Sequence, residues 1–153
     1  MSVEVGQKLP PFSCVSHDGI IVNNETIAGK KTIITIFSNG DSTSCNKQIC
    51  SLNDRFSSLK NKGYQIYGLS PEKVAKNQKV AKKYNISYPL LSDPDKEALH
   101  TFGLFGPKKF MGKDVMGVYR SAIVVDENGT ITHFIDKVLS ADHGSQILET
   151  ING

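Results

Sequence analysis

The sequence lacks several features that would define its class at once. It has no apolar run long enough to span a membrane, so we expect no membrane partner. Its first residues, MSVEVGQKLPPF, lack the charged and apolar regions of a secretory signal, so a cytoplasmic location is expected. Three cysteines are too few, and odd in number, for a disulfide-stapled scaffold. The formal charge of +3, without a basic patch interleaved with aromatics, predicts no nucleic-acid partner.

The composition is that of an ordinary globular protein. Of 153 residues, 39% are hydrophobic and 22% are charged, which is enough apolar material for a core and argues against disorder. The chain contains no internal repeat, low-complexity segment or linker. We therefore expect a single domain over residues 1–153.

The first half predicts a strand, a helix and a second strand. Residues 32–37 (TIITIF) are β-branched and apolar, which is typical of a buried strand. A helical pattern follows over residues 43–62, and residues 64–69 (YQIYGL) predict the next strand. The apolar face of the helix is expected to carry Cys45, Ile49, Leu52, Phe56 and Leu59. Gly63 is expected to end it, and the whole reads as a right-handed parallel βαβ unit.

The second half adds two helices and a hairpin. Ser70 and Asp93 are predicted helix caps, each followed by a proline in the first turn, with a short strand in YPLLSD between the two helices. Strands over residues 119–126 and 130–136 flank Asn128-Gly129, a strong hairpin signal.

The end of the chain and one internal segment complete the pattern. Ser140 is expected to cap a last helix that runs to about residue 151, and the Gly- and Lys-rich residues 103–118 are expected to form a long loop. The fold class is therefore α/β, with a central mixed β-sheet flanked by helices.

Two thiols stand out, because they lie five residues apart in the helix that starts at residue 43. Cys45 falls in the first turn, where unpaired amides and the helix dipole favour a thiolate. Cys50 is rotated by roughly 140° and displaced by about 7.5 Å along the axis. The Cα separation of about 8.7 Å exceeds the roughly 7 Å that a disulfide tolerates. A Cys45–Cys50 disulfide would therefore require the start of the helix to unwind.

Other interpretations of the cysteines remain open from the residues alone. The pair could be incidental helix residues, and Cys14 is expected to be a buried small hydrophobe. A structural zinc site would need cysteines two to four residues apart and two further ligands. The four histidines show no such grouping and are expected to be surface or packing residues: His17, His100, His133 and His143.

A family resemblance covers nearly the whole chain. The segments VGQKLPPFSC, FSNGDSTSCNKQICSLNDRF, YQIYGLSPEK, KKYNISYPLLSD, FGLFGPKKFMGK, GVYRSAIVVDENGTI and FIDKVLSADHGSQIL occur in this order. This resembles the peroxiredoxins of the bacterioferritin-comigratory, or peroxiredoxin Q, class. The resemblance implies a thioredoxin-like fold and an antioxidant enzyme that reduces hydrogen peroxide and organic hydroperoxides through thiol chemistry. It also implies no metal, haem or flavin cofactor, recycling by thioredoxin or a similar dithiol, and a monomer.

The resemblance assigns roles to four residues. Cys45 matches the family's peroxidatic cysteine, and Cys50 matches the resolving cysteine that forms an intramolecular disulfide with it. Ser42 matches the hydroxyl that binds peroxide, and Arg120 matches the arginine that completes the active site. From the residues alone, Arg120 is either a cation beside the thiolate or a surface charge at a strand end.

The chain departs from the family pattern at three places. Ser38 replaces the proline that shields the reactive cysteine, Thr43-Ser44 replaces a Pro-Gly pair, and Phe105 replaces a tryptophan. Two alternatives to the peroxidase follow: a redox sensor, and a thiol–disulfide exchange protein without peroxidase turnover. The lysines at 76, 79 and 83 could dock an acidic partner, but a solvated helix face is the expectation.

Overall fold

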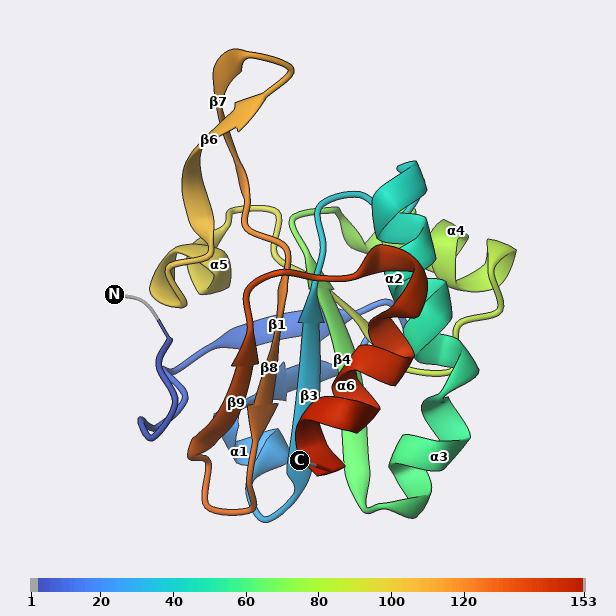
Figure 1. The fold of residues 1–153 in the computed structure, drawn as a ribbon, viewed down its shortest axis with the longest axis vertical. Helices are drawn as coiled ribbons and strands as arrows, with labels where there is room; N and C mark the ends of the chain where they lie inside the picture. The colour runs from blue at the N-terminus through green and yellow to red at the C-terminus, as the bar shows by residue number, and fades with distance from the viewer. Residues whose placement is uncertain (1–2, 153) are drawn as a thin grey trace.

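A seven-stranded mixed sheet forms the centre of the computed structural model, which describes residues 3–152 (Figure 1). The strand order is β2-β1-β5-β4-β3-β8-β9. The parallel pairs are β3 with β4 and β4 with β5, and the other neighbours are antiparallel. The bounds are β1 Ser13–Ser16, β2 Ile21–Asn23, β3 Lys31–Ile36, β4 Tyr64–Ser70, β5 Leu90–Ser92, β8 Ser121–Val125 and β9 Ile131–Ile135.

Helices cover both faces of this sheet. The helices are α1 Asn24–Ile27, α2 Thr43–Asp54, α3 Phe56–Asn61, α4 Val74–Lys83, α5 Glu97–Thr101 and α6 His143–Asn152, with a 3₁₀ turn, η1, at Ser140–Asp142. The α2 layer is the apolar cluster that one sheet face forms with α2, α3, α4 and α6. The α5 layer is the cluster on the other face, formed with α1, α5 and the N-terminal segment. This architecture matches the thioredoxin-like arrangement that the resemblance implies.

The βαβ unit is confirmed, with one break in its helix. β3 and β4 pair in parallel over six residue pairs, and Gly63, at φ +91°, ends the helical segment as expected. The helix is not continuous, because the Arg55 N–H bonds to Leu52 O in a tightened turn. Residues 43–62 therefore form α2 and α3 in place of a single helix.

Three predicted helix starts are wrong by a few residues. Ser70 is the buried last residue of β4, and α4 begins only at Val74. Asp93 accepts N–H bonds from Ala98 (3.3 Å) and Leu99 (2.8 Å), but α5 begins at Glu97. Ser140 lies in η1, whose turn delays α6 to residue 143.

The predicted loop at residues 103–118 is instead a projecting hairpin. Strands β6 Phe105–Phe110 and β7 Lys113–Val118 pair in antiparallel register and extend away from the sheet (Figure 1). The two turn residues, Met111 and Gly112, both have positive φ, which is the geometry of a tight two-residue hairpin. The predicted hairpin at Asn128-Gly129 is confirmed by the pairing of β8 with β9. No helix within residues 3–152 is long and apolar enough to cross a membrane.

Candidate active site

Cys45 lies in the first turn of α2, as predicted, and residues 37–42 connect this helix to the C-terminal end of β3. Its side chain is buried, with 1% of its surface exposed. The sulfur lies 3.4 Å from both the backbone N and the Oγ of Ser38. The thiol is therefore enclosed by the loop that joins β3 to α2.

The loop changes the acidity of this thiol. Burial is the largest single influence and raises the pKa of Cys45, since it disfavours the charged form. The opposing contributions come from the backbone N–H of Asn39, the hydroxyls of Ser38 and Ser42, and the backbone of Ser38. Together these donors hold the pKa of Cys45 below its ordinary value of 9.0. The structure thus favours a thiolate in a place that is largely closed to water.

Ser42 stands at the N-cap of α2 and is exposed. Its hydroxyl donates to Asn39 O at 2.9 Å. Because a hydroxyl carries a single proton, Ser42 donates either to this carbonyl or to the sulfur of Cys45. The side chain is thus free to exchange one acceptor for another at the mouth of the site.

Helix α4 contacts the same loop through ion pairs and close packing. Asp41 forms ion pairs with Lys76 and, at 3.8 Å, with Lys83. Gly40 packs so closely on α4 that a Cβ there would lie 2.7 Å from Cγ1 of Val80. Two of the three lysines in the predicted stripe therefore have a partner within the chain.

Arg120 lies between β7 and β8 and reaches the first turns of α2. Its Nε donates to Gln48 Oε1 at 3.0 Å, and its Nη2 donates to Ser44 O at 3.2 Å and to Ser140 Oγ at 2.6 Å. Within residues 3–152, none of its hydrogen bonds ends on the sulfur of Cys45. The guanidinium therefore contacts α2 at Ser44 and Gln48, the residues on either side of Cys45 in its first turns, while the loop donors lower the pKa of the thiol.

Cys50 occupies a different environment in the same helix. It is partly exposed at the edge of the α2 layer, and it is a free thiol, as are Cys14 and Cys45. Burial and the charge of Asp54 raise its pKa. The two thiols of α2 are thus shifted in opposite directions.

Cys14 belongs to the opposite side of the sheet, in the α5 layer. Burial, with the nearby carboxylates of Asp93 and Glu97, raises its pKa to about 12. The interpretation of Cys14 as a buried small hydrophobe is confirmed. Among residues 3–152, no group of three or more His, Cys, Asp or Glu side chains could hold a metal ion.

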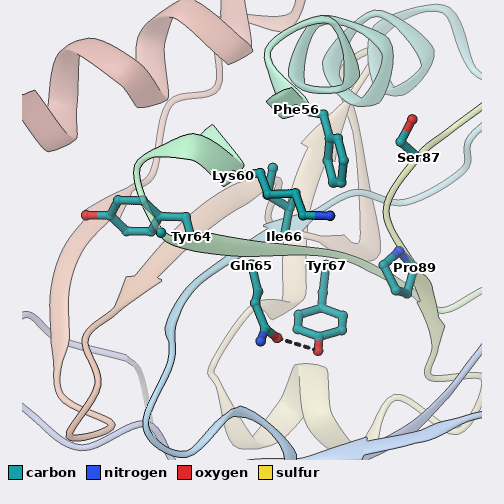
Figure 2. A pocket seen from close by; sticks show the side chains of 9 residues that line it. Phe56, Lys60, Tyr64, Gln65, Ile66, Tyr67, Ser87 and Pro89 are labelled. Carbon is teal, nitrogen blue, oxygen red and sulfur yellow. Dashed lines mark hydrogen bonds between the residues drawn. The ribbon is translucent and has the colours of Figure 1, made fainter. Parts of the chain in front are cut away.

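A surface pocket lies away from this site. A pocket of about 420 Å³ lies between α3 and the first residues of β4, lined among others by Phe56, Lys60, Tyr64 and Tyr67 (Figure 2). Cys45 lies beyond the C-terminal end of β3, and β3 is parallel to β4. The pocket therefore lies toward the opposite end of the sheet from the thiol.

The sequence reasoning missed three buried polar residues beside the site: Thr35, Gln48 and His143. Each is fully buried, and Gln48 holds Arg120 directly. Two signals were present. Thr35 interrupts an apolar strand. Gln48 directly precedes Ile49, which belongs to the helix face that was expected to be apolar.

Known proteins resemble this chain over most of its length. Residues 5–134 match the model of the AhpC/TSA family. A peroxiredoxin bcp from Coxiella burnetii is 32% identical over 148 residues, which cover 97% of this chain and 98% of the relative. Peroxiredoxin Bcp from Escherichia coli K12 is 31% identical over 95% of this chain and 94% of its own length. The structure of the Xanthomonas campestris bacterioferritin comigratory protein, studied for alkyl peroxide reduction, matches with a TM-score of 0.85 at 21% identity, over 92% of this chain and 90% of that one.

Proposed function

The chain belongs to the AhpC/TSA family, and from this we propose that it reduces hydrogen peroxide and organic hydroperoxides with Cys45 as the attacking thiol. The observation that carries the assignment of roles is the opposite acidity of two thiols in one helix. The pKa of Cys45 is lowered by the loop donors, whereas that of Cys50 is raised. Cys45 is therefore the more readily ionised of the two thiols, and the thiolate is the form of cysteine that attacks peroxide.

In the first step, the Cys45 thiolate attacks one oxygen of the hydroperoxide. The S–O bond forms as the O–O bond breaks, and the second oxygen takes a proton and leaves as water or an alcohol. Cys45 becomes a sulfenic acid. Ser42 and Arg120 supply donors beside the sulfur that stabilise the charge developing on the separating oxygens. This step needs no metal, haem or flavin.

In the second step, Cys50 attacks the sulfenic sulfur. An S–S bond forms, the S–O bond breaks, and water leaves with the proton of Cys50. Because the two Cα atoms of an intact helix stand about 8.7 Å apart, the first turns of α2 must unwind first. An external dithiol, which we propose to be thioredoxin or a similar protein, then reduces the disulfide by exchange.

Ser38 makes contacts with Cys45 that the family's proline could not make. A proline has no N–H and no hydroxyl, whereas Ser38 places both its backbone N and its Oγ 3.4 Å from the sulfur. The substitution thus adds polar contacts that favour the thiolate. We propose that the reactivity of Cys45 survives this departure, in a chain that acts as a monomer in the cytoplasm.

The test is the product of one equivalent of hydrogen peroxide on the reduced protein. Intact mass and peptide mapping should show the loss of two hydrogens and a Cys45–Cys50 bridge within seconds. Cys45→Ser should abolish peroxide consumption, and Cys50→Ser should consume one equivalent and stop at the sulfenic or a higher oxide. Cys14→Ser is the matched control and should behave as the wild type.

Three outcomes would redirect the assignment. Appreciable turnover by Cys45→Ser would refute the role of Cys45. A disulfide that forms stoichiometrically, but without turnover in the presence of thioredoxin, would favour a redox sensor. Thiols that stay reduced for many minutes would favour a thiol–disulfide exchange protein.

A further inference from the structure

Three polar side chains lie fully buried between the sheet and helices α2 and α6. Thr35 comes from β3, Gln48 from α2 and His143 from α6, and each is 0% exposed. Burial of polar groups is unfavourable unless each group finds a hydrogen-bond partner. No side-chain N or O atom buried within residues 3–152 lacks one. These three residues are connected to one another and to Arg120.

The orientation of the Gln48 amide follows from its neighbours. The guanidinium of Arg120 can only donate, so the atom 3.0 Å from its Nε is the amide oxygen of Gln48. The amide nitrogen then points the other way and donates to Thr35 Oγ1 at 2.8 Å and to Ile36 O at 2.9 Å. Because a backbone carbonyl can only accept, both ends of the amide independently require the same orientation.

The same reasoning fixes the proton of His143. Thr35 Oγ1 accepts from Gln48, and within residues 3–152 its other hydrogen-bond partner is His143 Nε2 at 3.0 Å. Gln146 Oε1 can only accept, so His143 carries a proton on Nδ1, 3.1 Å away, and a neutral ring leaves Nε2 to accept the proton of Thr35. The amide nitrogen of Gln146 donates to Lys137 O at 2.8 Å and ends the chain of bonds. Burial lowers the pKa of His143 to about 4, consistent with a neutral ring.

The chain of bonds therefore has a single direction, from Arg120 through Gln48, Thr35 and His143 to Gln146. It also returns to its starting point. Arg120 Nη2 donates to Ser140 Oγ, and Ser140 belongs to the η1 turn that leads directly into His143. The guanidinium is thus held from α2 on one side and from the start of α6 on the other.

We propose that Thr35 and His143 are positioning residues, which act through Gln48 to hold the Arg120 guanidinium beside Cys45 for its reaction with peroxide. This inference rests on the proposed peroxidase function. A long cationic side chain without fixed partners samples many rotamers, and misplacing a catalytic group by about 1 Å can cost about 100-fold in rate. The buried hydrogen bonds restrict the rotamers of Arg120, which in the proposed reaction interacts with both the sulfur and the peroxide.

The test compares two valine variants on the same strand. Thr35→Val removes the hydroxyl in the middle of the chain of bonds and keeps the shape of the side chain. Thr32→Val is the matched control, because Thr32 is also fully buried on β3 but donates to Lys30 O at 3.0 Å, outside the network. Two rates are measured for Cys45: oxidation by hydrogen peroxide, and alkylation by iodoacetamide across pH, which reports the thiolate alone.

Thr35→Val should lower the peroxide rate constant by about 10-fold or more, and Thr35→Ser should restore it. Thr32→Val should stay within about 2-fold of the wild type by the same reasoning. The alkylation profile should be unchanged in every variant, because the donors that lower the pKa of Cys45 belong to Ser38, Asn39 and Ser42. Equal peroxide rates for Thr35→Val and Thr32→Val would overturn the proposal.

Nuclear magnetic resonance separates this proposal from the proposed function and needs no turnover. The chain has only two arginines, so comparison with Arg120→Lys assigns the Arg120 Nε–H signal. That signal should be protected from exchange in the wild type and Thr32→Val, and lose protection in Thr35→Val. A wild type that consumes no peroxide refutes the function, whereas a signal equally protected in Thr35→Val refutes the positioning role. If Thr35→Val does not fold, the protonation state of the His143 imidazole is measured in the wild type. A proton on Nε2 at neutral pH would contradict the network.

Discussion

Acidification should destabilise this protein through the buried ring of His143. Burial is the main cause of the low pKa of His143, and the charge of Arg120 lowers it further, while the hydrogen bond to Gln146 acts in the opposite direction. The pKa falls from the ordinary value of 6.5 to about 4 in the folded protein. As the pH drops below 6.5, the unfolded chain binds a proton that the folded protein does not. Stability is therefore complete above pH 6.5 and declines until the pH reaches about 4.

The size of this effect follows from the two pKa values. Each pKa unit corresponds to about 1.4 kcal/mol, so the difference between 6.5 and about 4 makes about 3 kcal/mol. Domains of this size are stable by about 5–15 kcal/mol, so the protonation of this one histidine removes a large part of the stability. Protonation would also break the bond from Thr35 to Nε2, which needs that nitrogen as an acceptor.

Urea unfolding between pH 4 and pH 7.5 measures this contribution. The difference in free energy of unfolding between the wild type and His143→Gln should shrink by about 3 kcal/mol as the pH falls from 7.5 to 4. The reason is that glutamine does not titrate. His100→Gln is the control, since His100 is exposed on α5, and its curve should run parallel to that of the wild type. Parallel curves for wild type and His143→Gln would refute the reasoning.

Two further predictions concern other buried positions. Iodoacetamide at pH 8 should label Cys45 and leave Cys14 unmodified, because the pKa of Cys14 is raised to about 12; labelling of Cys14 without urea would contradict its burial. Gly144→Ala should lower the free energy of unfolding by about 1–3 kcal/mol, because the new Cβ would lie 2.4 Å from Ser51 O, in the backbone of α2. Urea curves test this, with the exposed Glu149→Ala as control, and equal midpoints for the two variants would disprove the clash.

The strongest patterns in the sequence predicted the parts of the fold that bury most apolar surface. The β3, α2 and β4 segments were identifiable because apolar residues recur with the period of each element, and Gly63 and Asn128-Gly129 supplied their turns. The hairpin at residues 105–118 was missed because glycines and lysines dominate it. Its pairing rests on backbone bonds and on the turn at Met111-Gly112, which leave little trace in apolar periodicity.

The site was only partly predictable, for a physical reason. Cys45 could be placed because the start of a helix after a strand creates a known environment for a thiol. Gln48 and His143 could not, because their importance depends on partners 72 and 108 residues away in the sequence, Arg120 and Thr35. A single sequence carries no signal for such pairs beyond an isolated polar residue in an apolar stretch.

The sheet separates two apolar layers that share no helix, and this division affects how the protein withstands repeated redox cycles. Cys45 and Cys50 both sit in the α2 layer or at its edge, while α1, α5 and the N-terminal segment cover the other face. If the start of α2 opens at every redox cycle, only one of the two layers is exposed to water. The intact face then preserves the sheet as a template on which α2 can re-form after reduction. Repeated opening is thereby compatible with a chain that never has to fold anew from its beginning.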